Sequence, residues 1–517
     1  MSIALVAIQY FILGLWPILV YANYPIHNLQ IFLAALFGSA ILCLSLYFGK
    51  AMLRMVYREF SLKEKILLGV VSFVQIFQLA LVFPGIISVD NLRMLDILMD
   101  GSWSAWGSSS YSLSLLASHF IFLSPFRISI LNLFILIFDL VCFLRLLPRK
   151  QPAWILALIM IFFCAPQTSL LILFENRDSL NSLLLVWLSL GLVAQWTPYR
   201  KDPWFHIYTL TLLTLFLIDL RQEAKILILL FPIGICWQKN MPTKRVLQLT
   251  AVIIFTSLSI ILLQKYFFDL DSYPAEYKAT PLINPLSYVF HERGLSAASE
   301  GELQDLERFF KVQYLIDYYN PFEIWPFHKG GVRYPFTEED FKAFRHAALS
   351  IIARYPSLFL QNRLNLSKHM LMFEGSQFET FDFLKLEIKL PHRKPLLWRQ
   401  FVVDYGPSFA PGLKKSMLKS FESIRSPSSS FARYFFASCF VPLVLMVTLI
   451  ASYRILPQLF AAALINIIRL LIVILLAPAA YFKYIASFWL LGWLFLIYIL
   501  ALKFEDVGKC SPQKLAP

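Results

Sequence analysis

The fold is decided by residues 456–477, LPQLFAAALINIIRLLIVILLA, an apolar run in which Arg469 is the one charged residue. An α-helix rises about 1.5 Å per residue, so about 20 apolar residues cross the roughly 30 Å hydrocarbon core of a bilayer. A helix packed in a soluble core needs no apolar run of this length. The stretch therefore predicts a transmembrane helix, and Arg469 is a residue that is costly to place there.

The whole composition agrees with this interpretation. Hydrophobic residues make up 58% of the chain and charged residues only 15%, against about 25% charged in an ordinary soluble domain. We expect an all-α integral membrane protein with about 11 to 13 transmembrane helices. The other candidate spans share this apolar character, and they are 3–22, 29–49, 66–85, 128–147, 153–173, 179–197, 204–219, 224–238, 247–264, 432–453 and 484–502.

The excess of positive charge gives the chain a direction. The formal charge is +14, and lysines and arginines gather in alternate short loops, beginning with the loop from Lys50 to Lys65. Loops of this kind face the cytoplasm. We therefore expect a multi-pass protein of the cytoplasmic (inner) membrane with both termini in the cytoplasm. The basic charge does not predict nucleic-acid binding, because no basic stripe with interleaved aromatic residues is present. The six cysteines include no pair at metal-ligand spacing.

Three regions follow from this topology. Residues 1–264 hold about nine spans, with interfacial helices in an outer loop at 86–127. Residues 265–430 mix both charge signs and predict a mainly α-helical extracytoplasmic domain. Residues 431–517 hold about three spans and a short cytoplasmic tail.

Within the soluble insert, the amphipathic runs 300–316 and 338–354 predict helices. Thr337, followed by three acidic residues, is the expected N-cap of the second run. The stretch 405–430 is rich in Ser, Pro, Gly and Lys, which predicts a loop that leads back to the membrane.

Ionisable residues gather at the predicted outer ends of the spans. Arg469 lies inside its span, and ionisable residues in such places usually line a cavity or pair with one another. We therefore expect a charged pocket at the outer membrane interface, built from Asp90, Asp96, Glu175, Arg177, Asp178, Asp219, Arg221, Glu223 and Arg469. Asp139 and Arg145 in the inner half of their span predict a structural ion pair.

Most of these residues also have a plainer interpretation. Asp178 and Arg177 fit a solvated turn, because outer loops are polar by default. Arg221 fits a side chain that snorkels to the interface, and Asp90 fits the cap of a short interfacial helix. Arg469 fits a plain interpretation least well, because of the cost of burying its charge.

Five segments resemble the GT-C superfamily of integral membrane glycosyltransferases. The first, FPGIISVDNLRMLDILMDGSWSAWGSSSYSLSLL (83–116), is similar to the family's first outer loop, with Asp90 and Trp106 in place. The second and third, ENRDSLNSLLLVWLSL (175–190) and LIDLRQEAKILILLFPI (217–233), resemble its later outer turns. The others are ARYPSLFLQNRL (353–364) in the insert and LLAPAAYFKYIASFWLL (475–491) before the last helix.

The resemblance implies a function and roles for the residues. Such an enzyme moves a sugar from a polyprenyl-phosphate carrier to a glycan, lipid or protein acceptor of the cell envelope. Asp90 would accept the proton of the acceptor hydroxyl, and Arg221 and Arg469 would hold the phosphate. The remaining substrate-binding candidates are Glu175, Arg177, Asp178, Lys483 and Tyr484. The resemblance leaves room for a divalent cation, Mg²⁺ or Mn²⁺, and requires none.

Three other classes of protein stay open at this point. A polysaccharide polymerase or O-antigen ligase also has about a dozen spans and a large outer loop. A transporter or flippase of lipid-linked glycans should show two related halves with broken helices, and the sequence shows no such halves. A non-catalytic assembly protein would tolerate neutral residues at Asp90 and Arg469.

Overall fold

We analysed a computed structural model of the chain. The structure describes these residues: 46–82, 86–87, 108, 111–112, 114–115, 127–148, 151–194, 203–237, 243–267, 275–322, 324–371, 410–423, 438–478 and 482–509. The predicted span 3–22 lies outside them, and so do residues 29–45 of the predicted span 29–49, Asp90 and Trp106.

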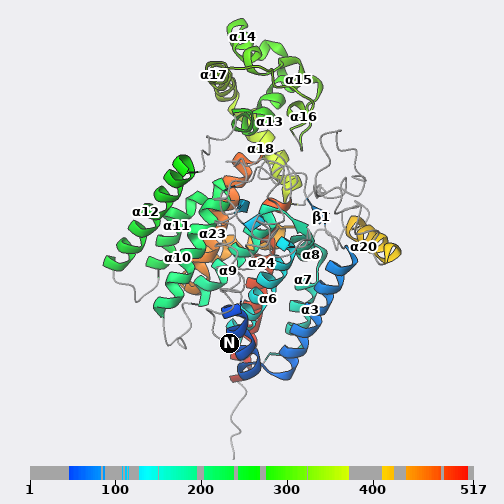
Figure 1. The fold of residues 1–517 in the computed structure, drawn as a ribbon, viewed down its shortest axis with the longest axis vertical. Helices are drawn as coiled ribbons and strands as arrows, with labels where there is room; N and C mark the ends of the chain where they lie inside the picture. Colours follow the sequence, from blue (N-terminus) through cyan, green and yellow to red (C-terminus); the bar gives the residue numbers. More distant parts are fainter. Residues whose placement is uncertain are drawn as a thin grey trace, which may run out of the picture.

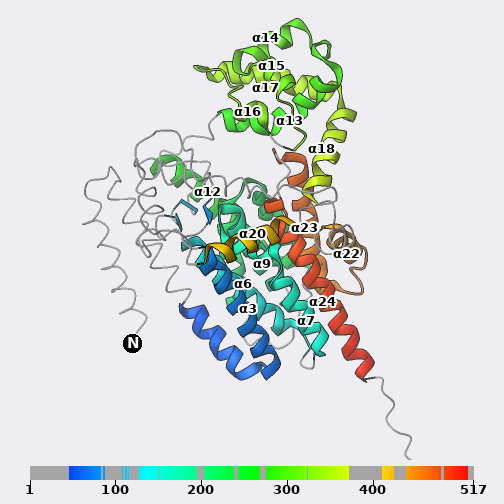
Figure 2. The same ribbon diagram turned by 90° about the vertical axis from the view of Figure 1, so that its right-hand side faces the viewer.

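Five described helices are long and apolar enough to cross a membrane. They are α3 (Leu62–Leu81), α6 (Arg127–Leu146), α9 (Arg177–Ala194), α23 (Pro457–Leu476) and α24 (Ala486–Lys509). They stand side by side in one bundle (Figure 1, Figure 2). The prediction of a multi-pass, α-helical membrane protein is confirmed at this level.

The predicted span 153–173 is instead two helices, α7 (Ala153–Phe163) and α8 (Pro166–Leu173), bent by 46°. Pro166 is the physical reason, because proline cannot donate the hydrogen bond that would continue a helix. At the break, side chains donate hydrogen bonds to the carbonyls at the end of α7. Gln75 Nε2 donates to the Phe163 carbonyl at 2.7 Å, and Thr168 Oγ1 donates to the Phe162 carbonyl at 2.7 Å.

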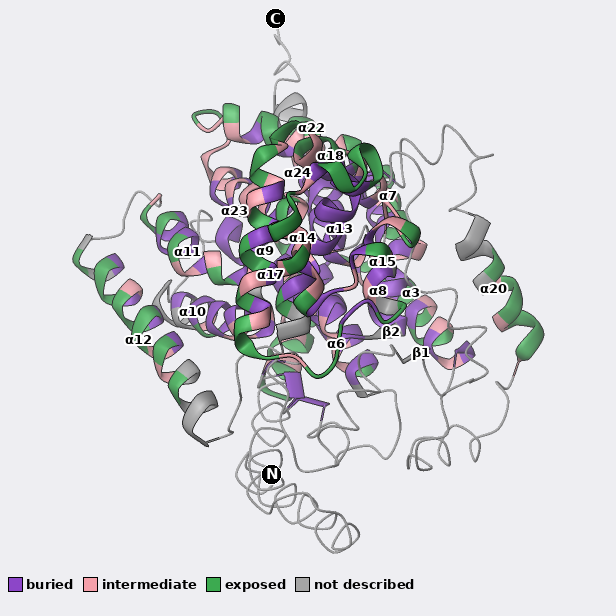
Figure 3. Ribbon diagram, turned by 90° about the horizontal axis from the view of Figure 1, so that it is seen from above, coloured by how far each residue is buried: buried purple, intermediate pink, exposed green. Residues whose placement is uncertain are grey.

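Further helices complete the bundle around α9, which is buried along most of its length. Residues 46–59 are helical. The named elements are α10 (Pro203–Leu220), η2 (Gln222–Ile226), α11 (Leu227–Cys236), α12 (Thr243–Phe267), α22 (Phe440–Ala451) and η6 (Phe482–Tyr484). A Cβ atom at Gly191 would lie 2.5 Å from Leu210 Cδ2, so this glycine allows α10 to approach α9 closely. Viewed from above, α12 lies at the periphery and is largely exposed (Figure 3).

A second hydrophobic core forms outside the bundle, from residues between Ala279 and Ile351. Its elements, above the bundle in Figure 1, are α13 (Ala275–Arg293), η3 (Leu295–Ala297), α14 (Glu300–Phe309), α15 (Val312–Asp317), α16 (Trp325–His328), α17 (Glu338–Arg354) and α18 (Pro356–Met370). We call this the α13–α18 region. Thr337 caps α17 in a reciprocal pair with Asp340, so the predicted N-cap is confirmed.

Two predictions about local structure were wrong. The stretch 405–430, expected to be a loop, contains the helix α20 (Pro411–Ser423). Its Leu413 and Met417 are spaced by four residues, and Met417 packs against the bundle core, which supplies the apolar contact that the loop prediction overlooked. Asp139 does not pair with Arg145. Arg145 instead pairs with Glu59 at 3.3 Å, and both carboxylate oxygens of Asp139 are buried without a hydrogen-bond partner.

Candidate functional site

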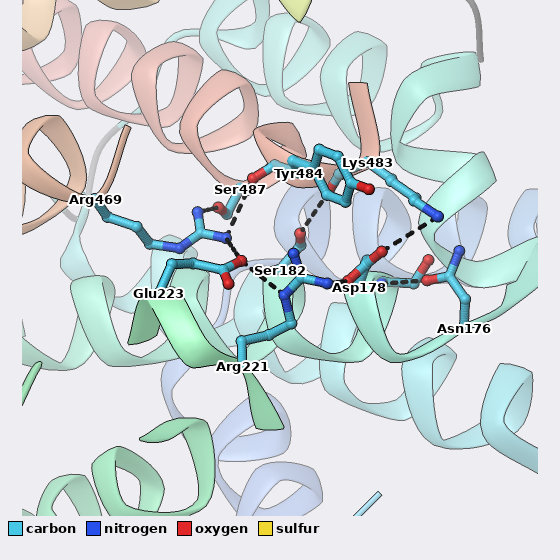
Figure 4. A network of polar contacts seen from close by, with 10 residues as sticks. Asn176, Asp178, Ser182, Arg221, Glu223, Arg469, Lys483, Tyr484 and Ser487 are labelled. Carbon is cyan, nitrogen blue, oxygen red and sulfur yellow. Dashed lines mark hydrogen bonds and ion pairs between the residues drawn. The ribbon is translucent and has the colours of Figure 1, made fainter. Parts of the chain in front are cut away.

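Five of the predicted site residues meet in one network of polar contacts (Figure 4). The network includes a residue of α23, the helix whose end is contacted by Arg363 of α18. Asp178 lies in the first turn of α9 and Arg221 between α10 and η2. Arg469 lies in α23, and Lys483 and Tyr484 lie in η6. Glu223 of η2 joins them. We call Asp178, Arg221, Glu223, Arg469 and Lys483 the charge cluster.

Asp178 is held by the start of α9. Asn176 precedes this helix, and its Oδ1 accepts a hydrogen bond from the Ser179 backbone N–H at 2.6 Å. Such a cap satisfies a free donor in the first turn. Asp178 in turn receives Lys483 Nζ at 3.4 Å from Oδ2 and Arg221 Nη1 at Oδ1. The residue is buried, so its interpretation as part of a solvated turn was wrong.

Arg221 is the centre of the charge cluster. Its backbone is extended at the break between α10 and η2, with φ −142° and ψ 140°. The guanidinium therefore leaves the helix axis and bridges two carboxylates: Nη1 binds Asp178, and Nε binds Glu223 Oε1 at 2.7 Å. The guanidinium carbon lies 5.1 Å from the ring centre of Tyr484. Its side chain is only 14% exposed, so it does not snorkel to the surface.

Arg469 has a different environment from Arg221. Its side chain is 3% exposed. Nη1 donates to Ser487 Oγ at 3.1 Å, and Nη2 donates to the Tyr484 carbonyl at 3.2 Å. The carboxylate paired with it, Glu223, is 4.0 Å away and already binds Arg221. Among the described residues, Nε has no hydrogen-bond partner. Arg469 is therefore a buried cation that has no carboxylate of its own in the described part of the chain.

The cluster as a whole carries a surplus of positive charge. Three cations, Arg221, Arg469 and Lys483, surround two carboxylates, so the formal sum is +1. A buried charge is stable only when it is paired and hydrogen-bonded. A surplus cation with a free N–H donor is therefore suited to receive an anionic group. Asp178 and Glu223 are both occupied by cations, which weakens them as proton acceptors.

The remaining predicted residues are placed only in part. Asp90 and Asp96 lie outside the described residues, but Ile86–Ile87 form β1, which pairs in parallel with β2 (Phe174–Glu175). Ile87 therefore lies beside the backbone of Glu175, near the start of α9. Arg177 is half-buried at the first position of α9. Among the described residues, no three His, Cys, Asp or Glu side chains are grouped to hold a metal ion.

Glu223 was predicted as part of the charged pocket because it shares a turn with Arg221, and the structure places it in the cluster. Sequence reasoning missed the serines that form hydrogen bonds around the cluster. Ser182 and Ser487 gave no signal, because serines are common in membrane helices. Ser182 Oγ donates to the Lys483 carbonyl at 3.4 Å, and Ser487 receives Arg469. These contacts join segments far apart in the sequence.

In comparisons with known proteins, no family model, no curated protein and no solved structure matches the chain. The fold and the site define a multi-pass α-helical membrane protein with a buried, positively charged cluster at one end of its bundle.

Proposed function

We propose that the protein is a membrane glycosyltransferase of the GT-C type. It would move a sugar from a polyprenyl-phosphate carrier to a glycan, lipid or protein acceptor of the cell envelope. The observation that carries the proposal is Arg469, a buried cation that, among the described residues, has no partner at Nε and no carboxylate of its own. A lipid phosphate that enters the end of the bundle would supply the missing negative charge.

The proposal includes a membrane topology. The protein would cross the cytoplasmic membrane about a dozen times, with both termini in the cytoplasm and the α13–α18 region on the outer face. The charge cluster would then lie near the level of the outer lipid headgroups, where a carrier phosphate resides. The α13–α18 region, directly above that end of the bundle (Figure 2), would receive the acceptor.

The residues divide into separate roles in this mechanism. Arg469 and Lys483 would bind the phosphate and stabilise the negative charge that grows on it as the sugar leaves. Arg221 would hold Asp178 and Glu223 in place, because both of its hydrogen-bonding edges are occupied. Asp178 and Glu223 are poorly suited to be the base, so Asp90 would accept the acceptor proton. Glu175 and Tyr484 would help to orient the substrates, and any divalent cation would be additional.

The cations of the cluster suit a phosphate carrier of either kind. A sugar phosphodiester bears one negative charge and a diphosphate diester bears two, and Arg177, which also acts on Asp178, adds to the positive surplus of the charge cluster. The choice between a monophosphate carrier and the diphosphate carrier of a polymerase or O-antigen ligase is therefore made by the binding test.

Binding to nanodiscs tests the proposal. The protein is reconstituted in phosphatidylcholine and titrated with polyprenyl phosphate, polyprenyl diphosphate and inorganic phosphate. We expect polyprenyl phosphate to bind more tightly than the other two. Binding of none of the three ligands, or equal binding of all three, would refute the proposal. A preference for the diphosphate would favour the polymerase or ligase class. A second assay measures sugar transfer by wild type and by Asp90→Asn. Loss of transfer in Asp90→Asn with binding retained would support the role of Asp90 as the base.

A further inference from the structure

The helix α18 belongs to both hydrophobic cores. Leu358 in its first turn packs against the core of the α13–α18 region. Leu366 and Met370 in its second half are buried in the core of the bundle. The helix therefore forms a continuous strut from one core to the other (Figure 2). Its end is tied to the bundle again, because the Cys439 backbone N–H donates to the Leu371 carbonyl at 2.9 Å.

Arg363 lies in the middle of this strut and is 2% exposed. Its Nη1 donates to the carbonyl of Ala477 at 2.8 Å, and its Nη2 donates to the carbonyl of Pro281 at 3.4 Å. Ala477 is the C-cap of α23, and Pro281 belongs to α13. One side chain thus joins α18 to the end of a bundle helix and to a helix of the other core.

In the part of the chain that the structure describes, the partners of Arg363 include no carboxylate. They are two carbonyls and the ring of Phe359, whose centre is 5.5 Å from the guanidinium carbon. Nε has no hydrogen-bond partner among these described residues. Burial lowers the pKa of Arg363 to about 10, so the side chain is still charged at neutral pH. The negative end of the α23 dipole at Ala477 offsets part of this charge.

Packing alone does not explain an arginine here. An apolar side chain of similar length would fill the space without the cost of burying a charge. The guanidinium adds directional hydrogen bonds, because it donates to two carbonyls that belong to different elements. The carbonyl that it holds belongs to α23, which carries Arg469, and residues 478–481 lead from there to Lys483 and Tyr484 of η6.

We propose that Arg363 is a positioning residue that couples the α13–α18 region to the charge cluster by holding the end of α23. This inference rests on the proposed function, because it concerns the same phosphate site. Movement of the α13–α18 region would shift Ala477 through Arg363 and so change the placement of Arg469 and Lys483. Coupling of this kind is reciprocal: phosphate bound at the cluster stabilises the contact of α18 with α23.

The test compares Arg363→Met and Arg363→Lys with wild type in nanodiscs. We measure the affinity for polyprenyl phosphate and the hydrogen exchange of peptides that cover 356–371 and 477–490. Arg363→Met should weaken binding by about tenfold, within the usual range of coupling between sites, and exchange in both peptides should speed up. Arg363→Lys keeps the charge but not the two-carbonyl geometry, and should lie between Arg363→Met and wild type.

Because the coupling is reciprocal, the effect of the lipid on hydrogen exchange is a second measurement. This effect would not depend on Arg363 if the residue had only a structural role. Polyprenyl phosphate should slow exchange in 356–371 of wild type and should not do so in Arg363→Met. Arg345→Met, which removes an exposed arginine of α17, is the control and should behave as wild type in both assays.

The outcomes separate the two proposals. If wild type binds the lipid and Arg363→Met binds it equally well, the coupling is refuted. Faster exchange with unchanged affinity refutes it too, because Arg363 would then be only a structural link. If Arg363→Met fails to fold, Arg363→Lys decides between the same outcomes. If wild type itself binds no polyprenyl phosphate, the proposed function fails, and exchange at 477–490 still reports whether Arg363 holds α23.

Discussion

Two ion pairs of the protein link the same kinds of group in different surroundings. One is Glu302–Arg354 in the α13–α18 region, and the other is Asp178–Arg221 in the charge cluster. Arg354 is 45% exposed and Glu302 15%. Arg221 and Asp178 are 14% and 9% exposed. The first pair borders water, where an ion pair contributes about 0–1 kcal/mol. The second is enclosed, where losing one partner costs about 3–5 kcal/mol.

The balance of charge also differs between the two regions. The arginines paired in α14–α17 each have an acid of their own: Arg354 has Glu302, Arg308 has Asp305, and Arg333 has Glu307. In the charge cluster, three cations share two carboxylates. Balanced surface pairs need no further explanation. A buried surplus is costly to the folded protein, so we attribute it to a ligand.

The largest effect on stability is expected for Arg221→Met. This change leaves Asp178 and Glu223 buried without their shared cation, and we expect it to destabilise the protein by about 3–5 kcal/mol. Thermal unfolding in one detergent measures the effect. Arg354→Met is the matched change in the exposed pair and should cost about 1 kcal/mol or less. Equal losses for the two variants would contradict the contrast between the regions.

A smaller effect of opposite sign is expected for Asp139→Leu in α6. The two side chains have the same branched shape, and the change removes two carboxylate oxygens that are buried without hydrogen bonds. Removing such a group should stabilise the protein by about 1–3 kcal/mol in the same unfolding assay. A loss of stability would mean that Asp139 binds a partner outside the described residues.

The smallest effect concerns Glu302. Burial alone would raise its pKa, but hydrogen bonds from Arg354, the Ser299 backbone and Ser350 outweigh it and lower the pKa to about 2. A lowered pKa stabilises the fold above the ordinary value of 4.5, and this contribution is lost as the pH falls toward 2.

Glu302→Gln should therefore destabilise the α14–α17 contact by about 1 kcal/mol at pH 7. The difference from wild type should shrink below pH 4.5. The readout is the stability of α14 and α17 at each pH, from pulsed proteolysis of the reconstituted protein. A difference that grows as the pH falls would contradict the assignment.

Much of the architecture could be predicted because the signals are local. Apolar length identified the spans at α6, α9, α23 and α24, and the acidic turn after Thr337 identified the start of α17. The break between α7 and α8 was missed, although Pro166 marks it, because hydropathy averaged over the whole run conceals one residue. The helix α20 was missed because its composition resembles that of a loop, and only contact with the bundle shows its apolar side.

The candidate site could be predicted residue by residue but not as a network. Arg469 stood out because one charge in an apolar run is costly anywhere. Which cation takes which carboxylate could not be predicted, because the partners lie on α9, η2, α23 and η6 and only tertiary packing brings them together. Arg363 gave no signal for the same reason: in a soluble helix an arginine is ordinarily exposed, and its burial depends on the end of α23.

The most direct test of the surplus-charge account is Arg469→Met, measured for stability and for polyprenyl-phosphate binding in the same nanodiscs. Arg469 has no carboxylate of its own among the residues that the structure describes, so replacing it should leave stability unchanged or slightly raised. Binding should weaken by roughly 100-fold, or about 3 kcal/mol, because a buried partner of the phosphate is lost. The account predicts this separation of binding from stability. Full binding by a stable Arg469→Met protein would contradict it.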